Sequence, residues 1–266
     1  LPVGGEMGRE RYLQKTAYLR RVQPAFQAYD EAKKALAKDD YATAREKLNK
    51  ALAIEPRESM FYNLQGDLYA LDKHHGKALA SYQKAVRLNP GFFYGYLRKG
   101  QMEYVEARYT PSRNSLTDSN DLMPTAEAHY TLGLIDKKQG NQAAAMEHFK
   151  TAAQSESETG KMATSELVIM DLEHNPGNYI ASRAVTDKNN VVWAQFLNRT
   201  NVPVRDIEIS YAWLDDQGQT RQGTKTYRGP LKGEAQDQVS LGITLNSAAE
   251  LSRRVRVEIT AARIAN

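Results

Sequence analysis

Three prolines, Pro56, Pro90 and Pro124, are spaced 34 residues apart along the sequence. Proline ends helices, because it lacks a backbone N–H and its ring clashes with the preceding helical turn. Gly66 and Gly100 each follow a proline at the same distance, ten residues further on. A period of this length indicates a repeat protein, in which short helical units stack and each unit contacts its neighbours. The chain is therefore expected to form a helical solenoid over much of its length.

The second half of each period carries small and large residues at matching positions. Small residues let two helices approach closely, and the large apolar residues four positions later fill the space between them. The small residues are Ala44, Ala78 and Ala145, the large ones are Leu48, Tyr82, Leu116 and Phe149, and Ala51, Ala85 and Ala152 close the pattern. At these residues the chain resembles the tetratricopeptide repeat, a helix-turn-helix unit of about 34 residues. The resemblance implies an α-helical solenoid that binds partner proteins in its concave groove.

The same pattern gives the expected boundaries of the helical part. Residues 1–24 are expected to form a linker and a short leading helix, and residues 25–157 about four tetratricopeptide repeats. A capping helix is expected over residues 158–175, because the last unit of a solenoid exposes an apolar face. The chain begins at Leu1 without an initiator methionine, and its first residues are rich in turn formers. These features favour a segment of a longer protein.

From residue 176 onward the apolar residues alternate with a period of two, which is typical of strands. Alternating runs occupy residues 192–197 and 207–213, and a hairpin-turn signal follows at residues 215–218. Further strands are expected over residues 220–227, 236–243 and 254–262. The expected fold class is therefore multidomain, α then β, with the repeat solenoid followed by a small antiparallel β-sandwich over residues 176–266. The pattern from Phe196 to Gly218 resembles the immunoglobulin-like modules of bacterial envelope proteins.

The sequence lacks the common motifs of catalytic and metal sites. It has no cysteine, and its five histidines include no His-Glu-x-x-His motif and no pair at i, i+4 spacing. Phosphate-binding glycine loops and the Gly-x-Ser-x-Gly motif are also absent from the sequence. We therefore expect this chain to have no catalytic residue, no metal site and no cofactor, and we expect His74 and His75 to lie in a solvated turn.

Charge and hydropathy argue against nucleic acid and membrane as partners. The net charge is +4, but basic and acidic residues alternate without a long run of one sign. Such a surface is typical of solvated proteins and not of a nucleic-acid footprint. The sequence contains no apolar run of 18 residues that would predict a membrane span. A protein or peptide is therefore the expected partner.

In tetratricopeptide arrays the first helix of each repeat lines the concave groove, so the resemblance implies which positions face a ligand. These positions are Phe26, Tyr29, Lys33, Met60, Asn63, Asp67, Tyr94, Leu97, Gln101, Tyr104 and Tyr130. Tyrosine and methionine suit protein contacts, because they offer a large area at a small entropic cost. The alternative for each tyrosine is that it packs between helices.

One variant of the fold binds the terminal carboxylate of chaperone tails with basic and asparagine residues. Tyr29 stands at the first basic position of that clamp, and Lys33 stands at its first asparagine position. The departure at these two positions predicts a ligand other than a chaperone tail.

A wider resemblance covers residues 1–157. The segments Leu1 to Glu6, Tyr18 to Arg20, Tyr29 to Ala32, Glu55 to Glu58 and Asn89 to Tyr94 resemble the C-terminal repeat region of BepA-like bacterial zinc metallopeptidases. The resemblance implies a periplasmic protein of the bacterial cell envelope, with zinc held by a preceding His-Glu-x-x-His domain. Because that motif is absent here, the resemblance transfers no zinc ligand and no catalytic residue to this chain.

Three hypotheses follow for the function of the chain. The first is a non-catalytic module that binds a partner or substrate for an attached metallopeptidase. The second is a free-standing scaffold or adaptor in envelope assembly with no enzyme attached. The third, an enzyme in its own right, would require a site built without any of the motifs considered above.

Overall fold

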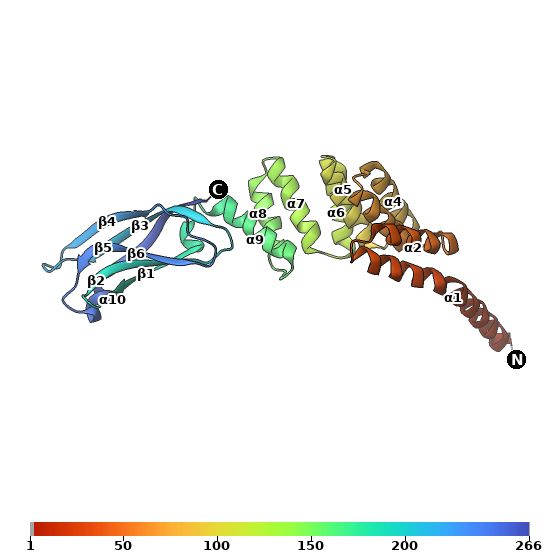
Figure 1. Cartoon of the computed structure of the whole chain (residues 1–266), viewed down its shortest axis with the longest axis horizontal. Coiled ribbons are helices and arrows are strands. Elements are labelled where there is room, and N and C mark those ends of the chain that lie inside the picture. The colour runs from red at the N-terminus through yellow and green to blue at the C-terminus, as the bar shows by residue number, and fades with distance from the viewer. Residues whose placement is uncertain (1–2, 266) are drawn as a thin grey trace. The chain divides into compact units, whose positions relative to one another are not determined.

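The computed structural model describes residues 3–265, so Leu1 and Pro2 of the expected linker, and Asn266, lie outside the described residues. The chain divides into two compact units, Leu1–Ala145 and Met146–Asn266. We call them the helical unit and the β unit, and Figure 1 labels their elements. The boundary between the units falls inside helix α8 (Gln142–Ala152).

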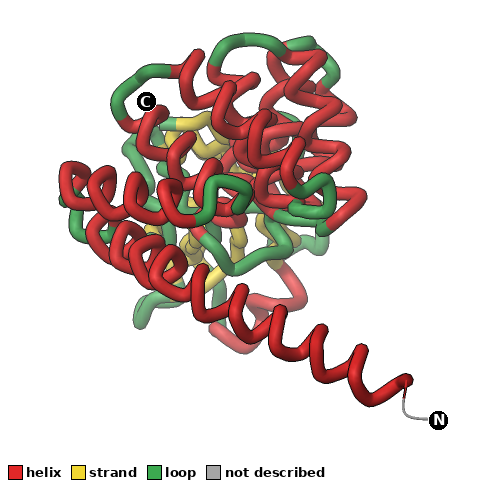
Figure 2. The backbone as a smooth tube through the Cα atoms, turned by 90° about the vertical axis from the view of Figure 1, so that its right-hand side faces the viewer, coloured by secondary structure: helices red, strands yellow, loops and turns green. Residues whose placement is uncertain are grey.

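The helical unit consists of helix pairs joined by short turns (Figure 2). Its other helices are α1 (Val3–Leu36), α2 (Tyr41–Ile54), α3 (Ser59–Leu71), α4 (His75–Leu88), α5 (Phe93–Val105), α6 (Tyr109–Leu122) and α7 (Ala126–Lys138). The most extensive contacts between helices are made within the pairs α1–α2, α3–α4 and α5–α6. These are the pairs that the repeat pattern predicts, and the periodic prolines Pro56, Pro90 and Pro124 lie between successive pairs.

The turn inside each repeat has the same backbone geometry. Asp39, Lys73 and Ala107 have positive φ angles of 58°, 60° and 56°, and Gly140 in the fourth repeat has a φ of 80°. The backbone N–H of the following residue donates to a carbonyl in the last turns of the helix. In the second repeat, His74 N donates to the carbonyl of Tyr69 at 2.9 Å. This left-handed residue commonly ends a helix, and it is usually glycine because other residues are strained there by about 1–2 kcal/mol.

The matching small and large positions of the repeats are buried, as predicted. The two recurring glycines lie where a first helix crosses its partner closely. A Cβ atom at Gly66 would lie 2.4 Å from Cε1 of Tyr82, and one at Gly100 would lie 2.7 Å from Cγ of Leu116. Both distances are far below van der Waals contact. The glycines that the period reveals are therefore required for helix packing.

Helix α1 departs from the sequence-based expectation. Residues 1–24 were expected to form a linker and a separate helix, but one helix runs from Val3 to Leu36 and passes through Pro24. Most described side chains before Val22 are exposed, and this part of α1 extends beyond α2 (Figures 1 and 2). Residues 9–23 are mostly good helix formers. Pro24 lacks the backbone N–H for one hydrogen bond of this helix, and the helix continues on both sides of it.

The described part of the β unit contains two three-stranded antiparallel sheets. One sheet has the order β1 (Ile180–Thr186), β2 (Val191–Asn198), β5 (Gln236–Thr244), and the other has the order β4 (Thr220–Tyr227), β3 (Val204–Leu214), β6 (Val255–Ile264). Apolar residues from both sheets form one core, among them Phe196 and Ile209. Strands β2 to β6 occur where the period-two pattern predicts them, whereas β1 was not predicted. A short helix, α10 (Leu251–Arg254), precedes β6, and single 3-10 turns occupy Pro176–Asn178 and Ala248–Glu250.

Helix α9 (Glu158–Asp171) is part of the β unit. Val168 on this helix and Leu172 just after it belong to the core that the two sheets form. The hydroxyl of Tyr179 donates to Asp171 Oδ2 at 2.9 Å and ties the end of the helix to the segment that enters β1. The sequence predicts a helix here, but it does not predict that the apolar face of this helix covers strands.

Asn198, which is buried at the end of β2, connects two loops of the β unit. Its Nδ2 donates to the backbone oxygen of Val202 at 2.8 Å and to that of Lys232 at 3.2 Å. Its Oδ1 accepts from the backbone N–H of Thr200 at 3.0 Å and from the hydroxyl of Thr200 at 2.8 Å. The amide is thus fully used, which is the usual state of a buried polar side chain.

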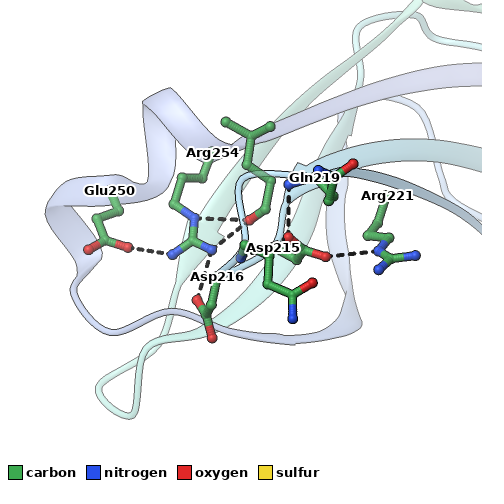
Figure 3. A network of polar contacts seen from close by, with 8 residues as sticks. Asp215, Asp216, Gln219, Arg221, Glu250 and Arg254 are labelled. Atoms are coloured by element: carbon green, nitrogen blue, oxygen red, sulfur yellow. Dashed lines mark hydrogen bonds and ion pairs between the residues drawn. The ribbon is translucent and has the colours of Figure 1, made fainter.

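Arg254 fixes the predicted hairpin turn at residues 215–218 to the start of β6 (Figure 3). Its guanidinium donates to the backbone oxygen of Leu214 at 2.6 and 2.9 Å, to Asp216 at 3.0 Å and to Glu250 at 2.9 Å. Each of the three guanidinium nitrogens therefore has a partner within the β unit. The role of Arg254 that follows from these contacts is structural.

Candidate functional site

A pocket of about 480 Å³ opens between the first helices of the first three repeats. Its walls come from α1, α3 and the start of α5, and they consist of Tyr29, Lys33, Leu36, Ala37, Met60, Asn63, Leu64, Asp67, Phe92 and Tyr94. Six of these are groove positions expected from the sequence, namely Tyr29, Lys33, Met60, Asn63, Asp67 and Tyr94. The fold brings these six residues, which come from three separate repeats, onto one surface.

Asp67 at the pocket wall is held by two neighbours, the buried Tyr82 and the half-buried Arg98. Its Oδ1 accepts from the hydroxyl of Tyr82 at 2.8 Å and from Nε of Arg98 at 2.7 Å. The guanidinium of Arg98 also donates to the side chain of Gln101 at 2.9 Å. These contacts join α3, α4 and α5, so they fix the carboxylate in position and partly neutralise its charge.

The tyrosines that line the pocket are less acidic than ordinary tyrosines. Burial and the nearby Asp67 carboxylate raise the pKa of Tyr29 to about 12. Burial and the same carboxylate also raise the pKa of Tyr94, although the Arg98 cation opposes the rise. Both phenols therefore stay neutral hydrogen-bond donors throughout the physiological pH range.

The raised pKa of Tyr29 predicts a loss of stability at high pH. Its favourable contribution is complete below the ordinary tyrosine pKa of 10.0 and disappears as the pH rises through the folded-state value of about 12. The variant Tyr29→Phe should remove one tyrosinate absorbance step centred near pH 12 and should lessen the loss of stability above pH 10. A difference titration of the folded protein measures this step. A step centred near pH 10 would contradict the assignment.

Asn63 is the unusual polar residue of the pocket wall. It is 2% exposed, and neither Nδ2 nor Oδ1 of its amide has a hydrogen-bond partner. Buried amides are nearly always paired, and each unsatisfied group costs about 1–3 kcal/mol. The pocket wall therefore contains one enclosed amide that its protein neighbours leave unsatisfied.

The other expected groove residues lie outside the pocket. Leu97 was expected to face the groove, but it is 4% exposed and packs in a core cluster with Leu116 and Leu132. Phe26 packs edge to face on Phe61, with ring centres 5.4 Å apart. The others are Gln101, which accepts from Arg98, Tyr104, which packs on Tyr109 with ring centres 6.0 Å apart, and Tyr130, which is half-buried on α7.

Four residues of the pocket wall were not among the expected groove positions: Leu36, Ala37, Leu64 and Phe92. Phe92 precedes α5 and lies in the turn between two repeats, so a rule based on helix positions does not reach it. The aromatic run from Phe92 to Tyr96 was the available signal in the sequence. Leu36 and Ala37 lie at the C-terminal end of α1, and their assignment depends on where that helix ends.

The described residues include no group of three or more histidine, aspartate or glutamate side chains placed to bind a metal ion. Within the same residues, no helix is both long and apolar enough to cross a membrane.

A Lys-Ser-Glu cluster, in which the serine and the glutamate are buried, joins α5 to α6. Lys99 Nζ donates to Ser115 Oγ at 2.7 Å, and Ser115 Oγ in turn donates to Glu103 Oε2 at 2.7 Å. A catalytic serine must be reachable by a substrate and must give its proton to a base as it attacks. Ser115 is buried, so a substrate could not reach its hydroxyl. The cluster therefore serves to hold the two helices of the third repeat together.

The repeats match known families and folds. A family model described as "Tetratricopeptide repeat" matches residues 29–91, and another with the same description matches residues 126–159. The protein SGT1 homolog of Bos taurus is 32% identical over 88 residues, which cover 33% of this chain and 26% of that relative. The chain therefore spans about a quarter of the length of this relative.

Two solved structures resemble the chain with TM-scores above 0.5. The Cut9–Hcn1 hetero-tetramer of the APC/C has a TM-score of 0.52 and 18% identity, and the match covers 61% of this chain and 33% of that chain. PilW, described as a widely conserved type IV pilus biogenesis factor, has a TM-score of 0.51 and 18% identity, with 56% and 69% covered. At such identities the likeness concerns the fold alone. Together with the family models, it confirms that this chain contains tetratricopeptide repeats.

Proposed function

We propose that the helical unit is a protein-interaction module that binds a polypeptide partner in the pocket between α1, α3 and α5. The observation that carries this proposal is the pocket itself, whose walls combine apolar side chains from three successive repeats with an amide that has no partner inside the protein. Tetratricopeptide arrays stack such units into extended concave surfaces, which other proteins occupy.

The chemistry of the wall supports a polypeptide ligand. Met60, Phe92 and Tyr94 offer a flexible thioether and two aromatic rings, which together can pack on a large apolar side chain. The volume of about 480 Å³ falls within the range of binding pockets in proteins. The ammonium group of Lys33 beside them can fix the orientation of a bound chain.

The test uses a photoreactive residue, p-benzoylphenylalanine, placed at position 94 in the full chain. The matched control carries the same residue at position 41 on α2, because Tyr94 and Tyr41 are both 36% exposed. Irradiation in the source cells should yield a protein adduct from position 94 and not from position 41. The additional substitution Met60→Ala should reduce the yield of that adduct, since it removes part of the pocket wall.

Two results would overturn the proposal. Equal adducts from positions 94 and 41 would show that contact with partners is not confined to the pocket. Adducts from position 94 that are unaffected by Met60→Ala, in a variant whose helical content is unchanged, would show that the pocket does not hold the partner.

We also propose, from the sequence resemblance, that the chain is the non-catalytic C-terminal part of a bacterial zinc metallopeptidase of the periplasm, with repeats over residues 25–157. We further propose that the β unit is an immunoglobulin-like sandwich. Its two antiparallel sheets, which share one apolar core, support this assignment. The alternative is a scaffold or adaptor with no attached enzyme. The mass and the zinc content of the native protein distinguish these two hypotheses. A metallopeptidase that contains this chain would be longer than the chain and would bind zinc, whereas an adaptor with no attached enzyme would show neither property.

A further inference from the structure

The β unit has a pocket of about 310 Å³ at the hairpin end of the sheet β4–β3–β6. None of the described residues that line it is acidic. Three cations around one hollow indicate an anionic ligand. We call this hollow the arginine pocket, and its wall includes Ala212, Leu214, Thr220, Arg253, Arg254 and Arg256.

The arginine pocket opens on the face of the sheet that points away from the core. On β3, Tyr211 belongs to the apolar core and Trp213 packs against it. Because successive side chains of a strand alternate between its two faces, Ala212 and Leu214 point outward. Arg256 on β6 is the register partner of Ala212, so it lies on the same outer face. The methyl group of Ala212 leaves a low floor beside the arginine side chain.

The three arginines differ in their contacts. Arg254 is held by Asp216 and Glu250 beside the hairpin turn (Figure 3). Arg253 and Arg256 are exposed, and within the described residues their guanidinium groups make no hydrogen bond or ion pair. A guanidinium group is a planar cation whose N–H donors match the two oxygens of a carboxylate. These two arginines are therefore available to bind an anion, while Arg254 holds the backbone between them in place.

The charge balance at the arginine pocket suits a ligand with one negative charge. Arg254 is paired with Asp216 and Glu250, so the three arginines and these two acids leave one excess positive charge. Glu258, two residues after Arg256 on the same face of β6, adds a negative charge beside the pocket. A phosphate group carries about −1.5 to −2 charges at pH 7, and nucleic acid carries many more. A carboxylate, with one charge, is the better match.

The remaining wall of the arginine pocket indicates what lies next to this carboxylate. Leu214 is a large apolar side chain that is exposed at the pocket, and Ala212 beside it is also apolar. Sites for small molecules are concave and bury most of the ligand. This pocket lies on the outer face of a sheet and its two free arginines are exposed, so it suits a side chain that another protein presents.

We propose that the arginine pocket binds an aspartate or glutamate side chain of a partner protein. Arg253 and Arg256 pair with the carboxylate, and an apolar residue next to it in the partner packs on Leu214. The site lies in the β unit, so it is a contact surface separate from the pocket between α1, α3 and α5.

The test selects peptides from a random phage-displayed library on the full chain, after depletion of the library on the double variant Arg253→Gln/Arg256→Gln. Depletion removes peptides that bind elsewhere, including those that bind the helical unit, because the variant differs from the wild type only in two exposed side chains. We expect the retained peptides to share an aspartate or glutamate next to an apolar residue. The variant should unfold like the wild type, since neither guanidinium group has a partner to lose.

Retained peptides are synthesised with both ends capped, in an acidic form and in a form whose acidic residue is replaced by its amide. The amide form should bind the wild type about tenfold more weakly, which is the effect of losing a hydrogen bond between charged groups. The double variant should bind both forms alike. Arg263→Gln, at an exposed arginine near the other end of β6, is the matched control and should keep the tenfold difference.

Several results would overturn the proposal. One is that no peptide is retained after depletion, and another is that the retained peptides lack an acidic residue. If only peptides with an uncapped C-terminus bound, the ligand would be a chain end and not an acidic side chain. If inorganic phosphate displaced the peptides much more strongly than acetate at equal ionic strength, the pocket would be a site for phosphate groups, and the assignment to a carboxylate would be wrong.

Discussion

Replacing Asn198 by aspartate is expected to destabilise the β unit by about 3–5 kcal/mol, the usual cost of a buried charge without a compensating partner. The Asn198→Asp variant removes the Nδ2 donor that now serves the carbonyls of Val202 and Lys232. It also places a carboxylate oxygen against those two carbonyl oxygens, so the loss of hydrogen bonds is joined by electrostatic repulsion. A domain of ordinary stability would lose a large part of its free energy of unfolding through this one change.

The chain offers a selective readout for this effect. Both of its tryptophans, Trp193 and Trp213, lie in the β unit, so denaturant unfolding followed by tryptophan fluorescence reports on that unit. Far-ultraviolet circular dichroism is dominated by the helices. The matched control is Asn246→Asp, at an exposed asparagine, which should change the free energy of unfolding by no more than about 0.5 kcal/mol. Equal effects of the two substitutions would refute the role given to the Asn198 amide.

The second large effect is expected from Gly66→Ala. A Cβ atom at this position would lie 2.4 Å from the buried ring of Tyr82, which is also held by its hydrogen bond to Asp67. The ring is fully buried and its hydroxyl is hydrogen-bonded, so we expect α3 to shift away from α4. Overpacking of this kind costs about 1–3 kcal/mol, and we expect a value near the upper end because both helices belong to the core of one repeat.

Gly76→Ala is the matched control for this prediction. Gly76 also lies in a helix of the second repeat, but a Cβ atom there would meet no atom within 4 Å. Alanine favours helix formation over glycine, so this variant should be unchanged or more stable by up to about 1 kcal/mol. The loss in Gly66→Ala should appear in the helical dichroism and should leave the tryptophan transition in place. If both variants unfolded alike, the close helix contact at Gly66 would be disproved.

The periodic part of the fold could be predicted from the sequence. Residues that recur every 34 positions must occupy equivalent places in a stack of equal units, so their places in the period alone assign Tyr82, Leu116 and Phe149 to the core. The strands β2 to β6 followed from their alternation in the same way. Both predictions succeed because burial imposes a period on the sequence.

Features set by tertiary contacts could not be predicted. None of the left-handed turn residues Asp39, Lys73 and Ala107 is a glycine, so their residue types did not indicate the positive φ angle. Strand β1 was missed because its sequence mixes polar and small residues without clear alternation, and it is stabilised by pairing with β2. The continuous α1 was missed because the weakly amphipathic residues before Val22 were assigned to a separate helix, whereas one helix runs from Val3 to Leu36.

The candidate site was partly accessible from the sequence. Repeat geometry identified the helix faces that meet at the pocket, and six of the eleven named positions lie there. Leu97 was misassigned because one face of a first helix is shared between groove and core, and the choice depends on how closely α5 and α7 pack. The state of Asn63 could not be predicted at all, since whether an amide finds a partner depends on its neighbours in space.

The packing of α9 on the strands sets a limit on how this chain can be divided. A protein cut between residues 175 and 176, where the helical pattern ends in the sequence, would separate Val168 and Leu172 from the core that they complete. The strands would then present a bare apolar surface to water, and such surfaces promote aggregation. The smallest piece that could be transplanted to another protein as an intact module therefore starts before Ser157, the residue that caps α9.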